Sequence, residues 1–291
     1  ATTPMIGEFV SQVGGDNINL TVLMPPEANP HTYDPSPQDA TTIAEADLVF
    51  FTGLKYEPAP LLKLLESSAC SPEVLAEVGE SVFPVEFKEG GHDDHDDHGE
   101  EGHDDEEEGH DGHEGHGHGA YDPHFWFDPN RVSYAAEYIE GKLIQYDPAN
   151  EESYKSLTDA FTTELRGLVN EVIELIGMIP SGNRKLITTH ESLGYLEAKF
   201  GLEVLATIIP SLDSSDEVSP SDLVEVIEVI EKEGVKVMFV ESETPSVYAE
   251  TLAEETGITL VTGLYVETLK PNQSYSEFLI SNVELIVNNL K

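Results

Sequence analysis

The chain has 291 residues and a formal net charge of −43, and its length suits two domains of typical size. Such a strongly negative surface repels nucleic acid and anionic lipid and concentrates cations. The single cysteine, Cys70, excludes an intramolecular disulfide and any zinc site built from several thiolates. No apolar run approaches the ~20 residues that a membrane-spanning helix needs.

Strands and helices alternate in the first part of the chain. Apolar spacing predicts a helix over 3–13, and INLTVLM at 18–24 predicts a strand. A helix over 36–46, a buried strand at 47–51 and a helix over 58–67 follow. Short apolar runs that alternate with helices indicate parallel βαβ units.

Two longer helices are predicted in the middle of the chain. The turn-and-cap signal Asp128-Pro129-Asn130 precedes a predicted helix over 131–145. Apolar residues over 150–178 recur at three- and four-residue steps, which indicates one long helix, and IPSGNR at 179–184 ends it. A long helix between two βα regions would serve as a rigid connector.

The alternation resumes after this helix. The order Ser219-Pro220-Ser221-Asp222 predicts a helix start, with a serine cap and a carboxylate three residues later. Strands are predicted at 185–189, 203–208, 235–241 and 258–262, and helices over 192–200, 219–233, 245–256 and 274–290. We therefore expect an α/β protein with a first lobe over 1–149, a connecting helix over 150–179 and a second lobe over 180–291.

Residues 89–119 contain only acidic residues, histidine and glycine, and carry fourteen carboxylates. Runs of like charge are usually solvated linkers, but a plain acidic linker has no need of imidazoles, and His-rich tracts typically bind metal. Without apolar side chains the tract cannot offset its ordering entropy. We expect a disordered loop that binds several ions weakly. Its histidines are His92, His95, His98, His103, His110, His113, His116 and His118.

The other three histidines stand alone, at His31, His124 and His190. Each lies in or just after a predicted βα junction, and open α/β sheets bind ligands at the carboxyl ends of their strands. Prolines close to His31 and His124 restrict the backbone there. A lone loop histidine is usually a polar surface residue, but three at equivalent positions favour a folded transition-metal site.

Three imidazoles leave one position of a tetrahedral site to fill. Glu267 follows the predicted strand ITLVT and is our candidate for it. Glu241 ends the strand VKVMFV and is the rival, or else a partner that fixes a histidine tautomer. The same orienting role is open to Asp34, Asp122 and Asp128.

Several of these segments carry a resemblance to a known family. The segments are MIGEFV, GGDNINLTVLMPPEANPHTYDPSP, ADLVFFTGLKYE, the acidic His-rich loop, DPHFWFDP, THESLGYLEAKFGL and FVESETPSVYAETLAEETGITLVTGLYVETL. Through them the chain resembles, over nearly its whole length, the cluster A-I metal-binding proteins of ABC transporters, the ZnuA/TroA type. This resemblance implies two α/β lobes joined by a long rigid helix, with metal in the cleft between them and delivery to a permease outside the cytoplasm.

Carried over by position, the resemblance implies His31, His124 and His190 as the first three ligands. The fourth, typically an aspartate in the family, falls on Glu267, and Asn29-Pro30 stands where the family often has Asp-Pro. Manganese-specific members carry a glutamate at the third position. The histidine here therefore favours zinc, because three imidazoles and one carboxylate suit zinc better than manganese. The affinity order of divalent metals leaves copper and nickel open.

We therefore expect a monomeric, extracytoplasmic solute-binding protein that captures Zn²⁺ and delivers it to an ABC permease, with no enzymatic activity. The opening ATTPMIGEF is typical of a processed mature form, and a lipid anchor upstream of it is compatible with this function. Because imidazole must be neutral to bind metal, binding should weaken below about pH 6.

Other functions stay open at this point. A Mn²⁺- or Fe²⁺-binding member of the same family is the nearest alternative. A three-histidine zinc hydrolase would need an open coordination position and a base such as Glu241, but HExxH, GxSxG and a phosphate-binding glycine loop are absent from the sequence. A zinc-buffering or surface-adhesion protein would use the same site, so the sequence separates it poorly.

Overall fold

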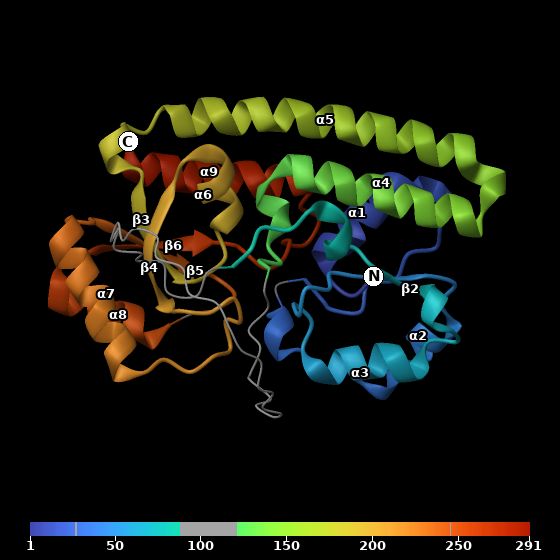
Figure 1. Cartoon of the computed structure of the whole chain (residues 1–291), viewed down its shortest axis with the longest axis horizontal. Coiled ribbons are helices and arrows are strands. Elements are labelled where there is room, and N and C mark those ends of the chain that lie inside the picture. Colours follow the sequence, from blue (N-terminus) through green and yellow to red (C-terminus); the bar gives the residue numbers. More distant parts are fainter. Residues whose placement is uncertain (27, 88–120, 245) are drawn as a thin grey trace, which may run out of the picture.

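The computed structural model describes residues 1–26, 28–87, 121–244 and 246–291 (Figure 1). The His-rich tract 89–119 lies outside the described residues. Two α/β lobes lie at opposite ends of the molecule, and the long helix α5 (Glu151–Gly177) runs along one side of both. This confirms the predicted fold class. No helix in the described ranges is long and apolar enough to cross a membrane.

The first lobe contains a small parallel sheet in which Val49 of β1 pairs with Leu75 of β2. Its helix α2 begins with a capping box, since the Ser36 hydroxyl accepts from the Asp39 N–H and the Asp39 carboxylate accepts from the Ser36 N–H. The elements of this lobe are α1 (Pro4–Gly14), α2 (Pro37–Glu45), β1 (Val49–Phe51), α3 (Ala59–Ser68), β2 (Leu75–Glu77) and α4 (Pro129–Tyr146).

The predicted strand at 18–24 is wrong, because no strand forms there. The segment instead lies beside the start of the chain, where the N–H groups of Leu23 and Met24 donate to the carbonyls of Ala1 and Thr2. These two hydrogen bonds do not make the continuous pattern that defines a β-strand. The strand β2 was not predicted, because its residues LAE contain no apolar run like the DLVFF that predicted β1.

The second lobe is built on a four-stranded parallel sheet in the order β4-β3-β5-β6. The predicted start of α7 is confirmed, since Ser219 caps it and forms a capping box with Asp222. The elements are β3 (Lys185–His190), α6 (Gly194–Phe200), β4 (Glu203–Ile209), α7 (Pro220–Glu233), β5 (Val237–Glu241), α8 (Val247–Thr256), β6 (Thr259–Leu264) and α9 (Tyr275–Leu290).

A layer of helices joins the lobes through one shared core. The apolar stripe of α5 is buried as predicted, including Phe161, Leu165 and Val172, and α9 returns to pack beside α5 (Figure 1). Full burial of each such side chain stabilises the fold by about 1.5–3 kcal/mol. The core therefore holds the two lobes in a defined relation.

Short 3-10 helices link the elements: η1 (Gly15–Asn17), η2 (Pro30–Thr32), η3 (Pro72–Val74), η4 (Gly79–Val82), η5 (Phe125–Phe127), η6 (Pro148–Asn150) and η7 (Ser181–Asn183).

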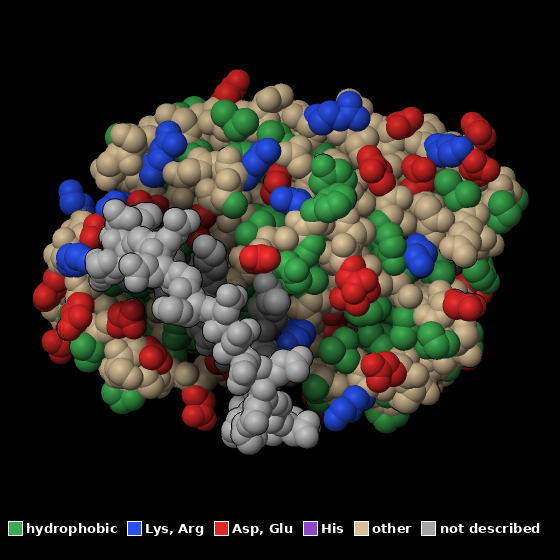
Figure 2. Space-filling model, in the orientation of Figure 1, with side chains coloured by type: hydrophobic (Ala, Val, Ile, Leu, Met, Phe, Trp, Pro, Cys, Tyr) green, Lys and Arg blue, Asp and Glu red, His purple; other side chains and the backbone are tan. Residues whose placement is uncertain are grey.

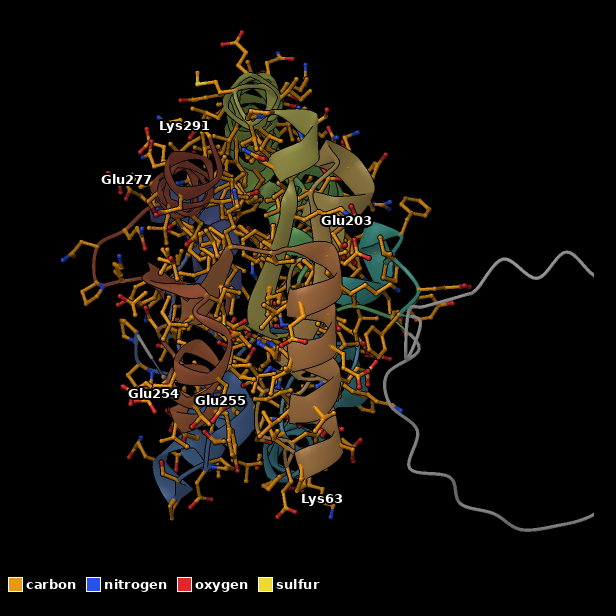
Figure 3. The ribbon with its side chains drawn as sticks, turned by 90° about the vertical axis from the view of Figure 1, so that its left-hand side faces the viewer. Lys63, Glu203, Glu254, Glu255, Glu277 and Lys291 are labelled. Carbon is orange, nitrogen blue, oxygen red and sulfur yellow. The ribbon has the colours of Figure 1, made fainter. Side chains whose placement is uncertain are left out.

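The surface carries the negative charge that the composition predicts. Asp and Glu side chains are spread over the face in Figure 2, with fewer lysines and arginines between them. Glu203, Glu254, Glu255 and Glu277 are exposed and labelled on a second view in Figure 3. Such a field raises the local concentration of cations around the molecule.

Candidate functional site

Four side chains from four separate segments meet between the lobes. His31 lies in η2, His124 directly precedes η5, His190 is the last residue of β3, and Glu267 follows β6. His31 is 7% exposed and the other three are 0% exposed. One potential metal-ligand atom from each residue lies within 4.8 Å of the others. The structure thus brings together the four residues that the sequence singled out.

The carboxylate of Glu267 stands at the centre of the three imidazoles. Its Oε1 lies 3.1 Å from His31 Nε2 and 3.0 Å from His190 Nε2, and its Oε2 lies 3.4 Å from His124 Nε2. Among the described residues, Nε2 of His124 and Nε2 of His190 are buried with no well-directed hydrogen bond. Buried polar atoms left in this way are costly, and a metal ion would satisfy them.

Carboxylates hold two of the imidazoles by their other nitrogen. Nδ1 of His124 lies 2.8 Å from Asp122 Oδ1, which also accepts from the His124 backbone N–H. Nδ1 of His190 lies 2.6 Å from Oε2 of Glu241. Glu241 Oε1 also accepts from the hydroxyl of Ser192. An Nδ1–H that donates to a carboxylate fixes the tautomer in which the Nε2 lone pair is free to bind metal.

His31 is held differently, through its backbone. Its N–H donates to Asn29 Oδ1 at 2.9 Å, while its Nδ1 lies 3.8 Å from Asp213. The amide of Asn29 donates across the lobes to Ser214 at 3.0 Å and Thr244 at 3.3 Å. The asparagine where the family often has aspartate therefore bridges the two lobes beside the site.

Glu267 is fixed at both its side chain and its backbone. The Tyr56 hydroxyl donates to Glu267 Oε2 at 2.9 Å and lies 3.0 Å from its carbonyl. The Glu243 carboxylate accepts from the N–H groups of Val266, Glu267 and Thr268. Sequence reasoning missed both Tyr56 and Glu243. The only available signal for Glu243 was its position two residues after the strand end at Glu241.

The charges of these groups are strongly coupled. Burial alone would lower the pKa of His124 and His190, but the carboxylates facing them outweigh it. The pKa of His124 is raised to about 9, mainly by Glu267 and Asp122, and that of His190 is raised by Glu241 and Glu267.

Burial opposes ionisation of Glu267, yet the three histidines lower its pKa. Burial and the charge of Glu267 raise the pKa of Glu243 to about 8. A dication would therefore displace protons from this centre.

The remaining predicted residues lie elsewhere. Asp128 caps α4 by accepting from the Asn130 N–H, and it faces Arg131. Neither Asp34 nor Asp128 hydrogen-bonds any of the three described histidines. The eight tract histidines fall outside the described residues, so the accessory loop stays a prediction.

Comparison with known proteins assigns the family. A family model described as zinc-uptake complex component A, periplasmic (ZnuA), matches residues 1–289. The metal ABC transporter substrate-binding lipoprotein ScbA of Streptococcus cristatus is 25% identical over 100% of this chain and 87% of its own length. The iron-binding protein YfeA of Yersinia pestis is 23% identical over 99% of this chain and 83% of its own length.

Solved structures show the same fold. The periplasmic zinc-binding protein TroA from Treponema pallidum superposes with a TM-score of 0.83 at 21% identity, covering 99% of this chain and 97% of its own. Fe(III)-bound YtgA from Chlamydia trachomatis gives a TM-score of 0.81 at 22% identity, covering 99% and 96%. The chain therefore belongs to the ZnuA family, the extracytoplasmic metal-binding components of ABC transporters.

Proposed function

We propose that this protein captures Zn²⁺ with His31, His124, His190 and Glu267 and delivers it to an ABC permease. The observation that carries the proposal is the convergence of three imidazole Nε2 atoms on one buried carboxylate. Zinc prefers four-coordinate sites of nitrogen and oxygen ligands. The protein acts as a monomer, held at the membrane by a lipid anchor upstream of these residues, in keeping with relatives named as lipoproteins.

The nitrogen-rich ligand set supports zinc over its nearest competitor. Relatives of similar identity are named for manganese, such as PsaA of Streptococcus anginosus, and for iron, such as YfeA. Manganese favours carboxylate, carbonyl and water ligands, whereas imidazole suits zinc. With three imidazoles and one carboxylate, this centre fits zinc better.

The arrangement supports binding rather than catalysis. A zinc hydrolase keeps one coordination position open for water and needs a free base nearby. Here Glu267 stands where the fourth ligand would be, and Glu241 is engaged by Nδ1 of His190. Neither the open position nor the base is provided by these residues, so we propose that the protein is not an enzyme.

Calorimetric titration with Zn²⁺ and Mn²⁺ tests the proposal. The intact chain and a form lacking 89–119 should each keep one tight Zn²⁺ site with weaker Mn²⁺ binding, and only the weak sites should vanish with the tract. His124→Ala should lose the tight site, whereas the exposed Glu203→Gln should keep it. Loss of tight zinc binding with the tract, or tighter binding of Mn²⁺ than Zn²⁺, would overturn the proposal.

A further inference from the structure

The chain that follows His190 also reaches the residue that orients His124. Helix α6 comes directly after β3 in the element order, begins at Gly194 and has Tyr195 as its next residue. Tyr195 is 1% exposed, and its hydroxyl donates to the backbone carbonyl of Asp122 at 2.8 Å. A side chain of the second lobe therefore holds, in the first lobe, the residue whose carboxylate bonds His124.

The Tyr195 hydroxyl is inserted between two backbone segments of the first lobe. Glu86 and Tyr121 form an antiparallel bridge, and beside it the Asp122 N–H donates to the Val85 carbonyl at 2.9 Å. An ordinary antiparallel pair would add a return bond from the Val85 N–H to the Asp122 carbonyl. Here the hydroxyl takes both places, since it accepts from that N–H at 3.2 Å and donates to that carbonyl. A phenylalanine ring would fill the same space but remove both bonds.

Gly194 allows the Asp122 side chain to lie against the start of α6. A Cβ atom at position 194 would lie 2.6 Å from Asp122 Oδ2, which is too close for two atoms that are not bonded, so a larger residue would displace the carboxylate. The carboxylate is not free to turn away. Its Oδ1 accepts from the His124 N–H at 2.8 Å and lies 2.8 Å from the ring Nδ1. Displacing it would disturb both contacts to His124.

This arrangement mirrors the contact at the fourth candidate ligand. Tyr56 of the first lobe donates to Glu267 of the second at 2.9 Å, whereas Tyr195 of the second lobe holds Asp122 of the first. Each lobe thus fixes an acidic residue of the other with a buried tyrosine hydroxyl. Because both bonds cross between the lobes, the orientation of one ligand from each lobe depends on how the lobes are placed.

We propose that Gly194 and Tyr195 are positioning residues for His124, acting from the second lobe through Asp122. The inference rests on the proposed capture of Zn²⁺ by the four candidate ligands. While Asp122 is held, the Nδ1–H of His124 has a fixed acceptor and its Nε2 stays directed at the centre. Once Asp122 is released, the imidazole turns more freely and a bound ion should leave faster.

Tyr195→Phe and Gly194→Ala in the full chain test the inference. Each should weaken zinc binding about tenfold, as residues that orient a ligand typically do, mainly through faster dissociation. Competition with a chelating dye measures the affinity, and stopped-flow transfer of zinc to excess chelator measures the rate. Amide hydrogen exchange of the zinc-free protein gives a readout that does not depend on zinc. The His124 N–H should exchange at least about tenfold faster, while the His190 N–H, which bonds Glu241, should not change.

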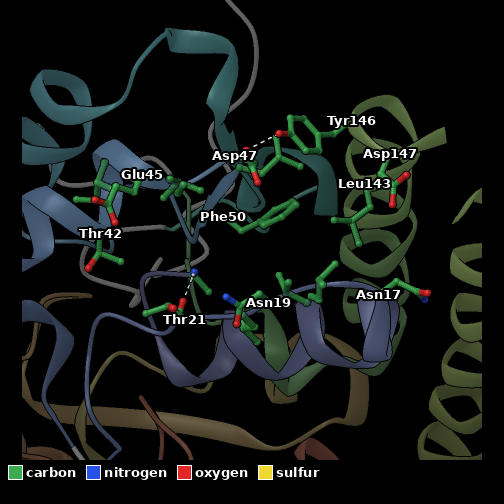
Figure 4. Close-up of a pocket in the computed structure, with 18 of the residues that line it drawn as sticks. Asn17, Asn19, Thr21, Thr42, Glu45, Asp47, Phe50, Leu143, Tyr146 and Asp147 are labelled. Atoms are coloured by element: carbon green, nitrogen blue, oxygen red, sulfur yellow. Dashed lines mark hydrogen bonds between the residues drawn. The ribbon is translucent and has the colours of Figure 1, made fainter. Parts of the chain in front are cut away.

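Two matched controls make the same chemical changes elsewhere in the fold. Tyr154 is also 1% exposed, and its hydroxyl donates at 3.0 Å to Asp147, which lines a pocket in the first lobe (Figure 4). A Cβ at the exposed Gly167 of α5 would meet no described atom within 4 Å. Tyr154→Phe and Gly167→Ala should therefore keep the zinc affinity and the exchange rate of the His124 N–H.

Unchanged exchange at the His124 N–H in both Tyr195→Phe and Gly194→Ala would overturn the inference. Equal acceleration at His124 and His190 would also overturn it, because it would show general loosening of the fold. So would faster exchange at His124 with unchanged zinc affinity, since the hold on Asp122 would then have no effect on binding. A tight zinc site missing from the unaltered chain would instead overturn the proposed function, and the exchange comparison would still show whether α6 holds Asp122.

Discussion

The hydroxyl of Tyr56 lies 2.9 Å from Oε2 of Glu267, although the two residues are 211 positions apart. Tyr56 comes from the loop after β1 in the first lobe, and Glu267 from the loop after β6 in the second. Both side chains are buried. This hydrogen bond ties the fourth candidate ligand to the opposite lobe and aims its carboxylate at the histidines.

Tyr56→Phe should weaken zinc binding about tenfold, since loss of a hydrogen bond to a ligating carboxylate typically costs 10–100-fold in affinity. The ring would stay packed edge-on against Trp126, so the fold should be kept. Competition with a chelating dye measures the change. Tyr134→Phe, on the exposed face of α4, is the control. Unchanged affinity in the Tyr56 variant would show that Glu267 does not need this bond.

Glu241→Gln should lower zinc affinity by about 10–100-fold, because His190 would lose the carboxylate that accepts from its Nδ1–H. Asp122→Asn should act in the same way on His124. Nitrogen NMR of the imidazoles gives a second readout, since each variant should mix the tautomers of its own histidine alone. Mixed tautomers at both histidines in either variant would point to general unfolding instead, and a loss of affinity with both tautomers intact would show that the carboxylates do not act by fixing them.

Zinc affinity should rise with pH over a window that extends to about pH 9. The pKa of His124 is raised to about 9 in the metal-free fold, and that of His190 is raised too. A raised histidine pKa stabilises the metal-free protein fully below the unfolded value of about 6.5, and this stabilisation is lost as pH rises through the folded value. The Tm of the metal-free protein should therefore fall between about pH 6.5 and 9.

Protons compete with zinc over the same pH window. As the pH is lowered, zinc binding should therefore begin to weaken well above the pH of about 6 that is expected for a histidine with an ordinary pKa. Calorimetry at pH 7.5 in two buffers of different ionisation enthalpy should detect proton release on binding. Equal apparent enthalpies in the two buffers would mean that the histidines are already neutral.

Glu243→Ala should destabilise the protein by about 1–3 kcal/mol, because the N–H groups of Val266, Glu267 and Thr268 would lose their acceptor. Zinc affinity should fall with it, as the loop that carries Glu267 loosens. Glu243→Gln keeps an amide oxygen that can accept from these N–H groups. It should therefore lose less stability and less zinc affinity than Glu243→Ala. Thermal unfolding with and without zinc separates the two effects. Equal losses of stability and zinc affinity in both variants would show that the loop depends on the charge of Glu243 rather than on its oxygen as an acceptor.

The sequence was a good guide where local periodicity decides the structure. The helix α5 was predicted within a residue at each end because its apolar stripe repeats along its whole length, and the start of α7 because Ser219 and Asp222 form a capping box. The segment 18–24 was wrongly predicted because its apolar run is typical of a strand. A strand also needs a neighbouring strand with which its backbone forms a continuous series of hydrogen bonds. Within the described ranges, the backbone there is bonded by Ala1 and Thr2 and by the hydroxyl of Tyr33, which donates to the Leu23 carbonyl.

The site was predictable to the extent that its residues are chemically rare. The isolated histidines could be picked out, and both its place after the predicted strand ITLVT and the resemblance pointed to Glu267. Tyr56 and Glu243 could not be found in this way, because tyrosine and glutamate are common in this chain and their roles exist only through contacts made on folding. The role of Glu241 was left open for the same reason, until its carboxylate was placed against Nδ1 of His190.

The four site residues divide evenly about the long helix α5. His31 and His124 come from the chain before it, and His190 and Glu267 from the chain after it. A separation of the lobes would leave each half with two donors, too few to hold the ion against water. The permease would therefore not have to compete with a complete coordination sphere. Any movement that takes one pair of candidate ligands away from the other would release the cargo, within the limits set by the core that the two lobes share.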